Sequence, residues 1–375
     1  MRVERRMRKT LPAAAVVAAA LAALTASTFV RAGQSADATA AHAAQRALPA
    51  GKSAVAWVRP GADGNRPTWG VRGGLLWGIL PQEGRSDGPR GLLRLRYPVL
   101  PKGEYDLINF IAVEPVVRGV KGYSELEPSR LDGVQGKRFW ATDPGARDGP
   151  QSATLPAATP PAGTLARLAS GAESLSVRVG VERFENVAHV ALTVAQCSAA
   201  PDEIELIVHA LPDSAPLDYC ILTATMGNKA RARRLWLADA VAASRKLYPE
   251  YRAADFAPHR FFALQRLLHT ASGEVLAAIT TDERDPAKVD PFPAQPGWRY
   301  GGFPVTQYWK KRPGGWRDDL HVAVNARYTY WLSQHPIPGG IAFENFEMRE
   351  RFYEGQRFVF GITRKTPAEL GFPNR

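Results

Sequence analysis

Apolar and polar residues alternate at every second position along much of this chain, and this alternation constrains the fold more than any other feature. The pattern is clearest in segments 175–181, 190–194 and 204–208. In the first, Leu175 begins an apolar series and Ser176 begins the polar series between its members. A period of two is typical of a strand with one buried face.

Ten further segments are predicted as strands, which gives about thirteen in all. They are 73–80, 91–100, 105–117, 217–226, 260–270, 274–282, 305–311, 321–332, 340–352 and 357–364. Most of the links between them are short, which favours antiparallel pairing over the strand–helix alternation of a parallel sheet. So many strands must divide into packed sheets. We therefore expect an all-β fold, a large antiparallel two-sheet sandwich with little helix.

Segment 229–247 has two interpretations. Its Ala, Leu, Arg and Lys content favours a helix, which Asn228 could cap. Leu235 and Leu237, on alternate positions, instead indicate two strands that turn at 238–239. We favour the strand pair.

The first 32 residues have the layout of a secretory signal peptide. Basic residues between Arg2 and Lys9 precede an apolar run, Leu11–Leu24, whose 14 residues are too few for a transmembrane helix of roughly 20. We expect cleavage after Ala26 or Ala32, a periplasmic or extracellular location, and no stable membrane span after cleavage. An uncleaved anchor is the alternative, and Arg5–Arg6 leaves the twin-arginine route open.

The rest of the chain is predicted to form one large domain. Residues 33–52 have the composition of a flexible leader, and the sandwich then occupies 53–375. Residues 143–163 are rich in Pro, Gly and Ala, which predicts a long loop within the sandwich, although a linker between two parts is the alternative.

Composition excludes several functions. The formal net charge is +12, and it falls to +7 without residues 1–32 because six Lys/Arg and one Glu lie there. This charge favours acidic partners such as uronate polymers, but no basic segment has the spacing of a nucleic-acid reader. No phosphate-binding loop or metal motif is present, so we expect no cofactor and no metal.

The chain has two cysteines, Cys197 and Cys220. If segments 188–196, 203–211 and 217–226 form a meander, these two residues lie too far apart for a disulfide, so we expect none.

The first group of candidate catalytic residues is acidic. Glu114 lies near the end of segment 105–117, and Glu125 and Glu127 follow it. Neighbouring carboxylates can divide acid and base roles between them, and glycoside hydrolysis requires two. Glu125 and Glu127 would point the same way if the backbone is extended. The structural alternative is a solvated loop.

The second group lies on predicted strand 321–332 and on the next strand. His321, Asn325, Arg327 and Trp331 alternate with the apolar series Val322, Val324, Ala326, Tyr328 and Tyr330. Arg can bind a carboxylate, Asn can donate a hydrogen bond, and His can transfer a proton. Glu344 and Glu347 follow, and pairs between these acids and His or Arg on a solvated face are the alternative.

The third group contains candidate substrate-binding residues. Asn228, Lys229 and Arg231 follow a Gly–Asn turn signal, and their positive charge would suit an anionic substrate. Tyr308 and Trp309 begin segment 308–319, whose Gly–Pro loop is predicted to be a lid or an exposed turn. Glu347 is included as a substrate-binding candidate. A solvated basic face is the alternative for the first three.

Alternating strands, an export signal and aromatic-rich loops together resemble the large two-sheet sandwiches of exported bacterial carbohydrate-active proteins. The galactose-mutarotase-like and polysaccharide-lyase-like sandwiches are the most similar in architecture, over residues 55–365. This resemblance implies a polysaccharide or other glycan as partner. No family motif matches residue by residue, so it transfers no catalytic residue.

Three functional hypotheses follow. In elimination, Arg327, Asn325 or Lys229 would neutralise a uronate carboxylate, and His321 or Tyr330 would take the proton. In hydrolysis, the acid and base would come from the glutamates named above. The alternatives to an enzyme are a non-catalytic glycan-binding module and a structural β protein of the cell envelope.

Overall fold

The computed structural model describes residues 46–47, 53–61, 66–79, 90–143, 160–283 and 301–374. The chain divides into two compact units, 1–46 and 47–375, with the short strand β1 (Arg46–Ala47) at their boundary. The second unit is described below. The predicted signal peptide, nearly all of the predicted leader and most of the 143–163 loop lie outside the described residues.

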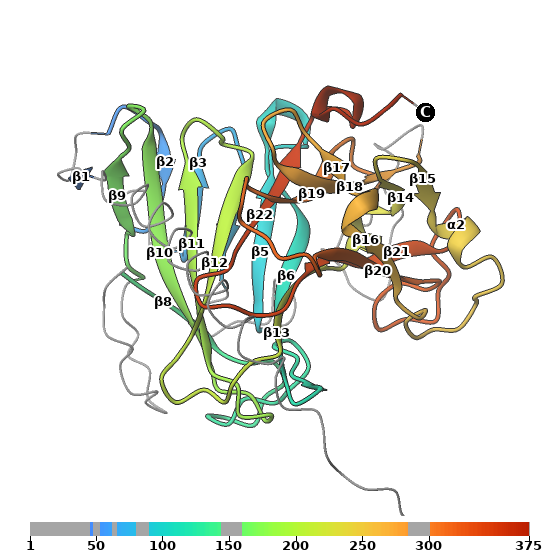
Figure 1. Ribbon diagram of the computed structural model, residues 1–375, viewed down its shortest axis with the longest axis horizontal. Coiled ribbons are helices and arrows are strands. Elements are labelled where there is room, and N and C mark those ends of the chain that lie inside the picture. Colours follow the sequence, from blue (N-terminus) through green and yellow to red (C-terminus); the bar gives the residue numbers. More distant parts are fainter. Residues whose placement is uncertain are drawn as a thin grey trace, which may run out of the picture. The chain divides into compact units, whose positions relative to one another are not determined.

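The second unit is built from two antiparallel sheets (Figure 1), as the alternation predicts. In sheet A the order along the hydrogen-bonded path is β9 (Thr164–Arg167), β10 (Glu173–Val181), β11 (Val190–Cys197), β12 (Glu203–Ala210), β22 (Arg357–Thr363), β19 (Thr306–Lys311), β18 (Val275–Thr281), β14 (Ala232–Trp236) and β15 (Val241–Ala243). Two short strands join this path, β8 (Phe139–Thr142) beside β10 and β17 (Leu268–His269) beside β18.

Sheet B has a comparable path. Its order is β16 (Arg260–Ala263), β20 (His321–Arg327), β21 (Ala342–Arg349), β13 (Tyr219–Thr225), β6 (Asp106–Val117), β5 (Leu92–Tyr97), β4 (Leu76–Gly78), β3 (Thr68–Val71) and β2 (Trp57–Val58). Strand β7 (Val120–Lys121) pairs with β6. The last strands of the chain, in orange and red in Figure 1, are divided between both sheets.

Helical structure is confined to short segments in the described residues. They are α2 (Ser244–Leu247) and the 3-10 turns η1 (Pro101–Gly103), η2 (Gly227–Ala230), η3 (Leu264–Arg266) and η4 (Ala368–Leu370). Segment 229–247 forms the strand pair β14–β15, as expected, with Leu237 N–H donating to Ala240 across the turn. Within this segment, the helix-forming residues form an α-helix only in α2.

One hydrophobic core lies between the two sheets. It joins Val179 and Leu192 of sheet A to Leu93 and Val113 of sheet B, all with no exposed surface. Buried polar contacts fix the sheets to each other. Asn109 donates to Gln307 over 2.8 Å, and such a bond prevents either amide from being buried without a partner. The packing of two inner faces around one core defines a sandwich.

Several predicted strands end early or belong elsewhere. Segment 217–226 does not continue a meander with 203–211, because β13 lies in sheet B while β12 pairs with β22 in sheet A. The 3-10 turn η3 divides segment 260–270 into β16 and β17. Segment 321–332 is extended only to Arg327, because the chain then turns and Thr329 pairs with Pro336.

More strands are present than the thirteen expected. The additional ones have two to four residues each and are β1, β2, β3, β7, β8 and β9. A period of two is not visible over so few positions. Both cysteines are free, with Cys220 buried in sheet B and Cys197 at the end of β11 in sheet A.

Candidate functional site

A cavity of about 300 Å³ lies on the outer face of sheet B, the face that points away from the core. Its floor comes from neighbouring strands. Each of five strands contributes one residue: β5 contributes Leu92, β6 Glu114, β13 Thr225, β21 Asn345 and β20 Asn325. This volume is at the lower end of the roughly 300–1,000 Å³ range of small-molecule sites.

The register of the strands determines which side chains reach this face. One row of directly paired residues crosses six strands, from β5 to β16. It contains Leu92, Ala112, Thr223, Glu347, Ala323 and Phe261. Directly paired residues share a face, while the residues next to them along each strand belong to the core. Ala112, Thr223 and Ala323 are small, which leaves space above the middle of the row.

Glu114 is a buried carboxylate in the cavity floor. It forms an ion pair with Lys121, and Thr223 Oγ1 donates to its Oε2 over 2.9 Å. Burial raises the pKa of Glu114, and the Lys121 ammonium opposes this shift. Lys121 also lies 4.9 Å from the centre of the Tyr123 ring, so the pair is held against an aromatic wall.

Glu347 lies next to this pair and is fully ionised at neutral pH. Its Oε1 is 3.3 Å from His259 Nε2, and Arg349 forms an ion pair with its other oxygen. Burial acts to raise the pKa of Glu347, but the hydrogen bond from His259 and the charge of Arg349 lower it to about 2.

Glu125 differs from both of these carboxylates. The residue is partly exposed, but its Oε2 is buried and has no hydrogen-bond partner among the residues that the structure describes. Burial, with repulsion from Glu114 as a second cause, raises the pKa of Glu125 to about 8. The cavity thus contains Glu125, a carboxylic acid with a raised pKa, beside Glu114, whose pKa burial also raises but which pairs with Lys121. Two carboxyl groups in different environments can divide the acid and base roles between them.

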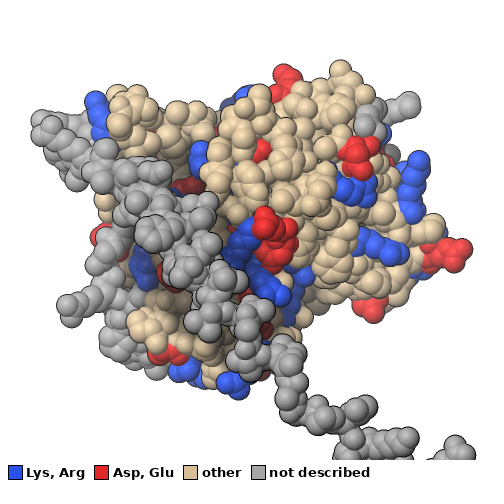
Figure 2. All heavy atoms as spheres, viewed as in Figure 1, with Lys and Arg blue, Asp and Glu red and all other residues tan. Residues whose placement is uncertain are grey.

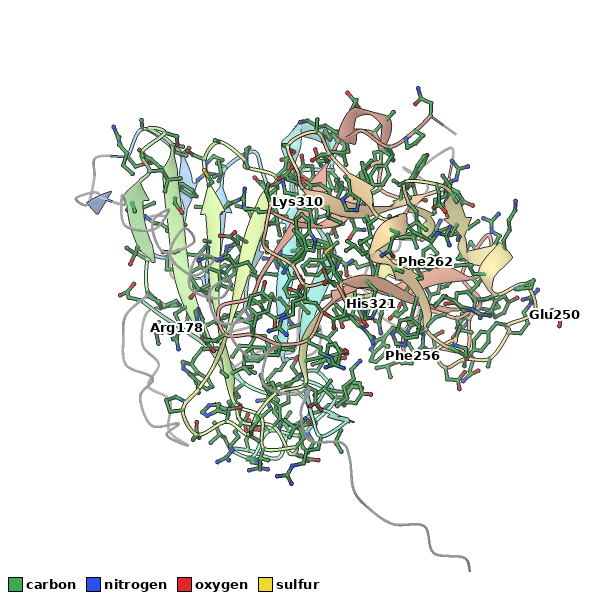
Figure 3. All side chains as sticks on the ribbon, in the orientation of Figure 1. Arg178, Glu250, Phe256, Phe262, Lys310 and His321 are labelled. Carbon is green, nitrogen blue, oxygen red and sulfur yellow. The ribbon has the colours of Figure 1, made fainter. Side chains whose placement is uncertain are left out.

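The walls of the cavity are aromatic and amphipathic. Phe256 and Trp331 pack at 6.2 Å between ring centres, and the Arg327 guanidinium lies over both rings. Phe256, labelled in Figure 3, lies on the loop that leads to β16. Flat aromatic walls with a polar floor suit a sugar ring, which has apolar faces and polar edges.

Two amides supply hydrogen-bond donors to the cavity. The oxygen of Asn345 accepts from Thr225 Oγ1 at 2.8 Å, and the oxygen of Asn325 accepts from the Asn345 backbone N–H at 3.0 Å. Both side-chain NH₂ groups remain available to a ligand hydroxyl group, with this assignment of the amides.

The structure brings part of the predicted site together. Glu114, Glu125, Asn325 and Trp331 line the cavity, and Glu347 lies at its floor through His259. Arg327 is buried behind the aromatic wall. His321 lies further along the same face, where its ring contacts Phe261 at 5.7 Å and its Nδ1 is 2.8 Å from the Asp319 carbonyl.

Glu127 does not accompany Glu125. The backbone turns at 124–126, so the two side chains do not point the same way, as an extended backbone would require. Glu127 accepts from the backbone N–H groups of Tyr123 and Glu185 and pairs with Lys137 at 3.2 Å. These contacts fix the loop that carries Glu125.

Glu344 is also outside the cavity lining. The register shift between Val324 and Ala326 gives β21 an extra residue, and Glu344 is buried there. Its oxygens have no hydrogen-bond partner in the described part of the chain, and burial raises its pKa to about 7 against the charge of Arg327.

The basic group 228–231 is not a solvated face. Asn228, Lys229 and Arg231 are all buried, in and just after η2, which carries the chain from β13 in sheet B to β14 in sheet A. The Gly–Asn signal therefore marks a crossover and not a hairpin. Met226 and Arg231, which flank η2, both have left-handed backbone conformations.

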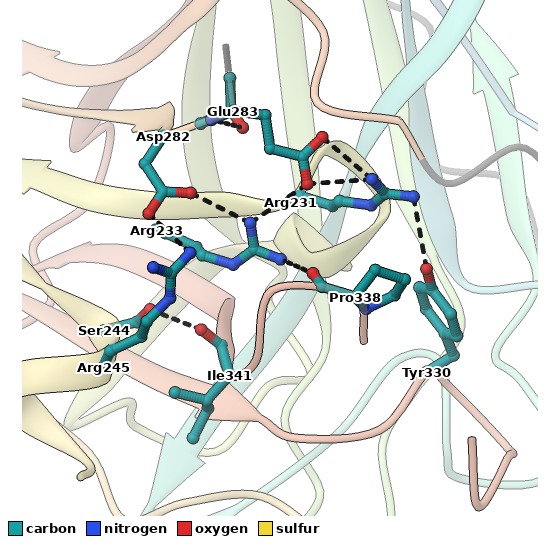
Figure 4. A network of polar contacts seen from close by, with 10 residues as sticks. Arg231, Arg233, Ser244, Arg245, Asp282, Glu283, Tyr330, Pro338 and Ile341 are labelled. Carbon is teal, nitrogen blue, oxygen red and sulfur yellow. Dashed lines mark hydrogen bonds and ion pairs between the residues drawn. The ribbon is translucent and has the colours of Figure 1, made fainter. Parts of the chain in front are cut away.

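Arg231 belongs to an ion network between β14 and the end of β18. Figure 4 shows Arg231 and Arg233 pointing toward Glu283 and Asp282. Arg231 is 2.9 Å from Glu283, and Arg233 is 3.0 Å from Asp282, which also pairs with Arg245 at 2.8 Å. Carboxylates thus already pair with these guanidinium groups.

Tyr308 and Trp309 are in β19 and not in a loop, so the lid interpretation is wrong for them. Trp309 is fully buried and its Nε1 donates to the Phe346 carbonyl at 2.8 Å, across the core. Tyr308 is buried on the other face of β19 and donates to Glu203 at 2.8 Å.

Sequence reasoning missed several cavity residues. Lys121 and Tyr123 share with Glu125 a spacing of two, a signal that could have been used. Phe256 and His259 come from a loop without periodicity, and only the fold brings them to β21.

In Figure 2 the basic and acidic side chains of the described residues are interspersed on the visible face. Within the described part, no three His, Cys, Asp or Glu residues gather in a way that could hold a metal ion. The same part has no helix long and apolar enough to cross a membrane.

No protein-family model matches this chain, and neither the curated proteins nor the solved structures include a significant match to it.

Proposed function

We propose that this chain is an exported enzyme that cleaves a glycan in the outer-face cavity of sheet B. Glu125 donates a proton to the leaving oxygen, and Glu114 acts as the second carboxylate. The observation that carries this proposal is the juxtaposition of a neutral carboxylic acid with the Glu114–Lys121 pair between aromatic walls.

Each part has a chemical role. A protonated Glu125 is the group that departure of a sugar oxygen requires, and Glu114 supplies the carboxylate that hydrolysis needs on the reacting sugar. Lys121 balances the charge of Glu114 without removing it. Phe256 and Trp331 would hold the sugar faces, and Asn325 and Asn345 would donate to its hydroxyl groups.

The experiment incubates the purified protein with a panel of neutral and acidic polysaccharides and measures new reducing ends and unsaturated products. Glu125→Gln and Glu114→Gln are each expected to lower the rate by about 10²–10⁴-fold. Glu250→Gln, at the exposed position labelled in Figure 3, is the matched control and is expected to keep full activity.

Reducing ends without unsaturation would support hydrolysis. Unsaturated products would instead support elimination, with Glu125 neutralising a uronate and His259 as the base. If both Gln variants keep full activity, the acid–base assignment is wrong. Glycan binding with no product would show a non-catalytic module.

A further inference from the structure

The outer face of sheet B carries a strongly exposed aromatic side chain beyond the cavity. Phe261, on β16, is 59% exposed. It is the last member of the outward-facing row that begins at Leu92, and β16 is the last strand of the sheet B path. The next residue, Phe262, is buried in the core, as expected where successive side chains of a strand point to opposite faces. Phe261 and the cavity therefore lie on one sheet face.

Three neighbouring side chains contact the Phe261 ring. The His259 ring lies nearly parallel to it, with 6.1 Å between ring centres and 25° between planes. The His321 ring meets it edge-on at 5.7 Å between ring centres, and the Arg349 guanidinium lies 5.6 Å from the ring centre. Arg349 already pairs with Glu347, so its contact with Phe261 positions the ring and does not provide a free charge. A ring that is positioned before its ligand arrives loses little entropy on binding.

His259 connects this ring to the cavity. Its side chain belongs to the cavity lining and also lies against Phe261. Phe256, on the cavity wall, precedes it by three residues in the same segment. The segment 256–261 therefore presents aromatic side chains that begin inside the cavity and end outside it. This surface gives an elongated ligand a path out of the cavity.

Strand spacing sets the length of this path. Along the row, four inter-strand spacings separate Ala112 on β6 from Phe261 on β16. Together they amount to roughly 19 Å. Glu114, in the cavity floor, lies two residues from Ala112 on the same strand. A ligand that reaches from Glu114 to Phe261 must therefore be longer than one sugar ring.

The chemistry around Phe261 suits a sugar. The C–H face of a sugar ring is apolar and packs on an aromatic ring, while its hydroxyl groups need hydrogen-bond partners. His321 Nδ1 lies 2.8 Å from the Asp319 carbonyl, an oxygen that only accepts, so this nitrogen carries a proton. That contact does not use Nε2, which is the ring nitrogen that a sugar hydroxyl group can meet.

A second copy of the chain, paired along β16, is the other candidate occupant of this edge. Edge pairing uses backbone groups in the plane of the sheet, whereas the Phe261 side chain points out of that plane. Strand β16 has four residues and begins with the exposed Arg260, and short, charged edge strands resist pairing. Edge pairing thus does not explain the exposed ring.

We propose that Phe261 is a sugar-binding platform outside the cavity, and that it binds one unit of a glycan chain whose neighbouring units occupy the cavity. The substrate class is therefore an oligosaccharide or polysaccharide bound along its length across the strands of sheet B, and not a mono- or disaccharide. This inference rests on the proposed function for the glycan in the cavity. The platform itself stands on the exposure of Phe261 and on the connection through His259.

The test measures binding by calorimetry with two homologous series, oligogalacturonates and cello-oligosaccharides, as disaccharides, tetrasaccharides and hexasaccharides. Every protein carries Glu125→Gln, which removes the proposed acid so that the ligands stay intact, and this protein is the parent. Phe261→Ala removes the ring and Phe261→Tyr keeps it. Val120→Ala is the matched control, because Val120 on β7 is 60% exposed and does not line the cavity.

In at least one series, the parent should bind the hexasaccharide more tightly than the disaccharide. Phe261→Ala should weaken hexasaccharide binding by about tenfold and leave disaccharide binding unchanged, because only the longer chain reaches the ring. Phe261→Tyr and Val120→Ala should both bind the two ligands as the parent does. Since Phe261 is largely exposed, its replacement leaves the core intact.

An equal loss of affinity for disaccharide and hexasaccharide in Phe261→Ala would overturn the proposal, because the residue would then act on the cavity itself. So would an unchanged hexasaccharide affinity in Phe261→Ala, weak binding by Phe261→Tyr, or no binding of either series. A dimer of the parent protein in analytical ultracentrifugation that Phe261→Ala dissociates would assign the ring to a second copy, which also overturns the proposal.

Glycan cleavage, measured with the Glu125 side chain restored, separates the two proposals. If hexasaccharide binding depends on Phe261 but no glycan is cleaved, the platform stands and the proposed enzyme fails. If a glycan is cleaved and Phe261→Ala cleaves short and long chains as wild type does, the proposed function stands and the platform fails.

Discussion

His259 Nε2 lies 3.3 Å from Glu347 Oε1, which joins a loop without regular structure to the centre of β21 at the cavity floor. Glu347 has no exposed surface, and Arg349 completes its pairing. The contact fixes one wall of the cavity to the sheet. It also makes stability depend on the charge of one buried carboxylate.

Replacing Glu347 by Gln is expected to lower the free energy of unfolding at pH 7 by about 3 kcal/mol. Removal of one partner from a buried charge pair leaves the other charge buried without a counter-charge. The pKa of Glu347 is about 2 in the fold and about 4.3 when unfolded. Its stabilisation is thus present above the unfolded pKa and is lost as the pH falls through the folded one.

Urea denaturation at pH 7 and pH 3 measures this effect. The difference in free energy of unfolding between wild type and Glu347→Gln should be smaller at pH 3 than at pH 7. Glu354, paired with His209 at 2.9 Å but 60% exposed, is the matched control. Glu354→Gln should change stability by less than about 1 kcal/mol, and an equally small change for Glu347→Gln would contradict the prediction.

Glu125 should show the opposite pH dependence. Its pKa of about 8 lies above its unfolded value, so its contribution to stability is complete at low pH and is lost as the pH rises through 8. Glu125→Gln cannot ionise, and we expect this variant to be more stable than wild type at pH 9 and similar to it at pH 4. Thermal denaturation at both pH values checks this expectation. An equal difference in stability between wild type and Glu125→Gln at pH 4 and pH 9 would refute it.

The tryptophans Trp309 and Trp331 should respond differently to replacement by Ala. Trp309 is fully buried between the sheets, so Trp309→Ala should cost about 3–5 kcal/mol of stability. Trp331 is partly exposed on the cavity wall, so Trp331→Ala should weaken glycan binding with a smaller loss of stability. Denaturation and calorimetry on both variants make the comparison. A larger stability loss for Trp331→Ala would show that this residue is mainly structural.

Lys311 and Glu350 form an ion pair with no exposed surface in the core-facing region of sheet A. Burial lowers the pKa of Lys311 despite the attraction of Glu350. Lys311→Met leaves a buried carboxylate without its cation and should cost about 3–5 kcal/mol. The double variant Lys311→Met, Glu350→Gln should recover most of this loss, because the Gln oxygen can still accept from the Arg317 N–H at 2.7 Å. No recovery in urea denaturation would mean that packing of the Lys311 stem on Phe358 dominates.

The alternation of apolar residues was sufficient to predict the long strands. Segment 105–117 is β6 to within one residue, and segments 188–196 and 203–211 pair as β11 and β12. The assignment of strands to sheets was not predictable in the same way. Strand β13 leaves β12 for sheet B because the pairing partners that complete it, β6 and β21, come from distant parts of the sequence.

The candidate site was predictable only where it lies on strands. Glu114 and Asn325 follow from outward-facing positions, whereas His259 and Phe256 depend on the path of a loop. Glu125 and Glu127 illustrate the same limit. Because the backbone turns at 124–126, Glu125 points into the cavity and Glu127 points toward Lys137. Charge patterning failed at Arg231 because its partner Glu283 is remote in sequence.

The turn η2 makes the cavity wall and the junction of the two layers one continuous piece of backbone. Met226 lines the cavity at the end of sheet B, and Arg231, five residues later, pairs with Glu283 in sheet A. Because so short a segment joins the two contacts, we expect a ligand that displaces Met226 to alter the packing between the two sheets.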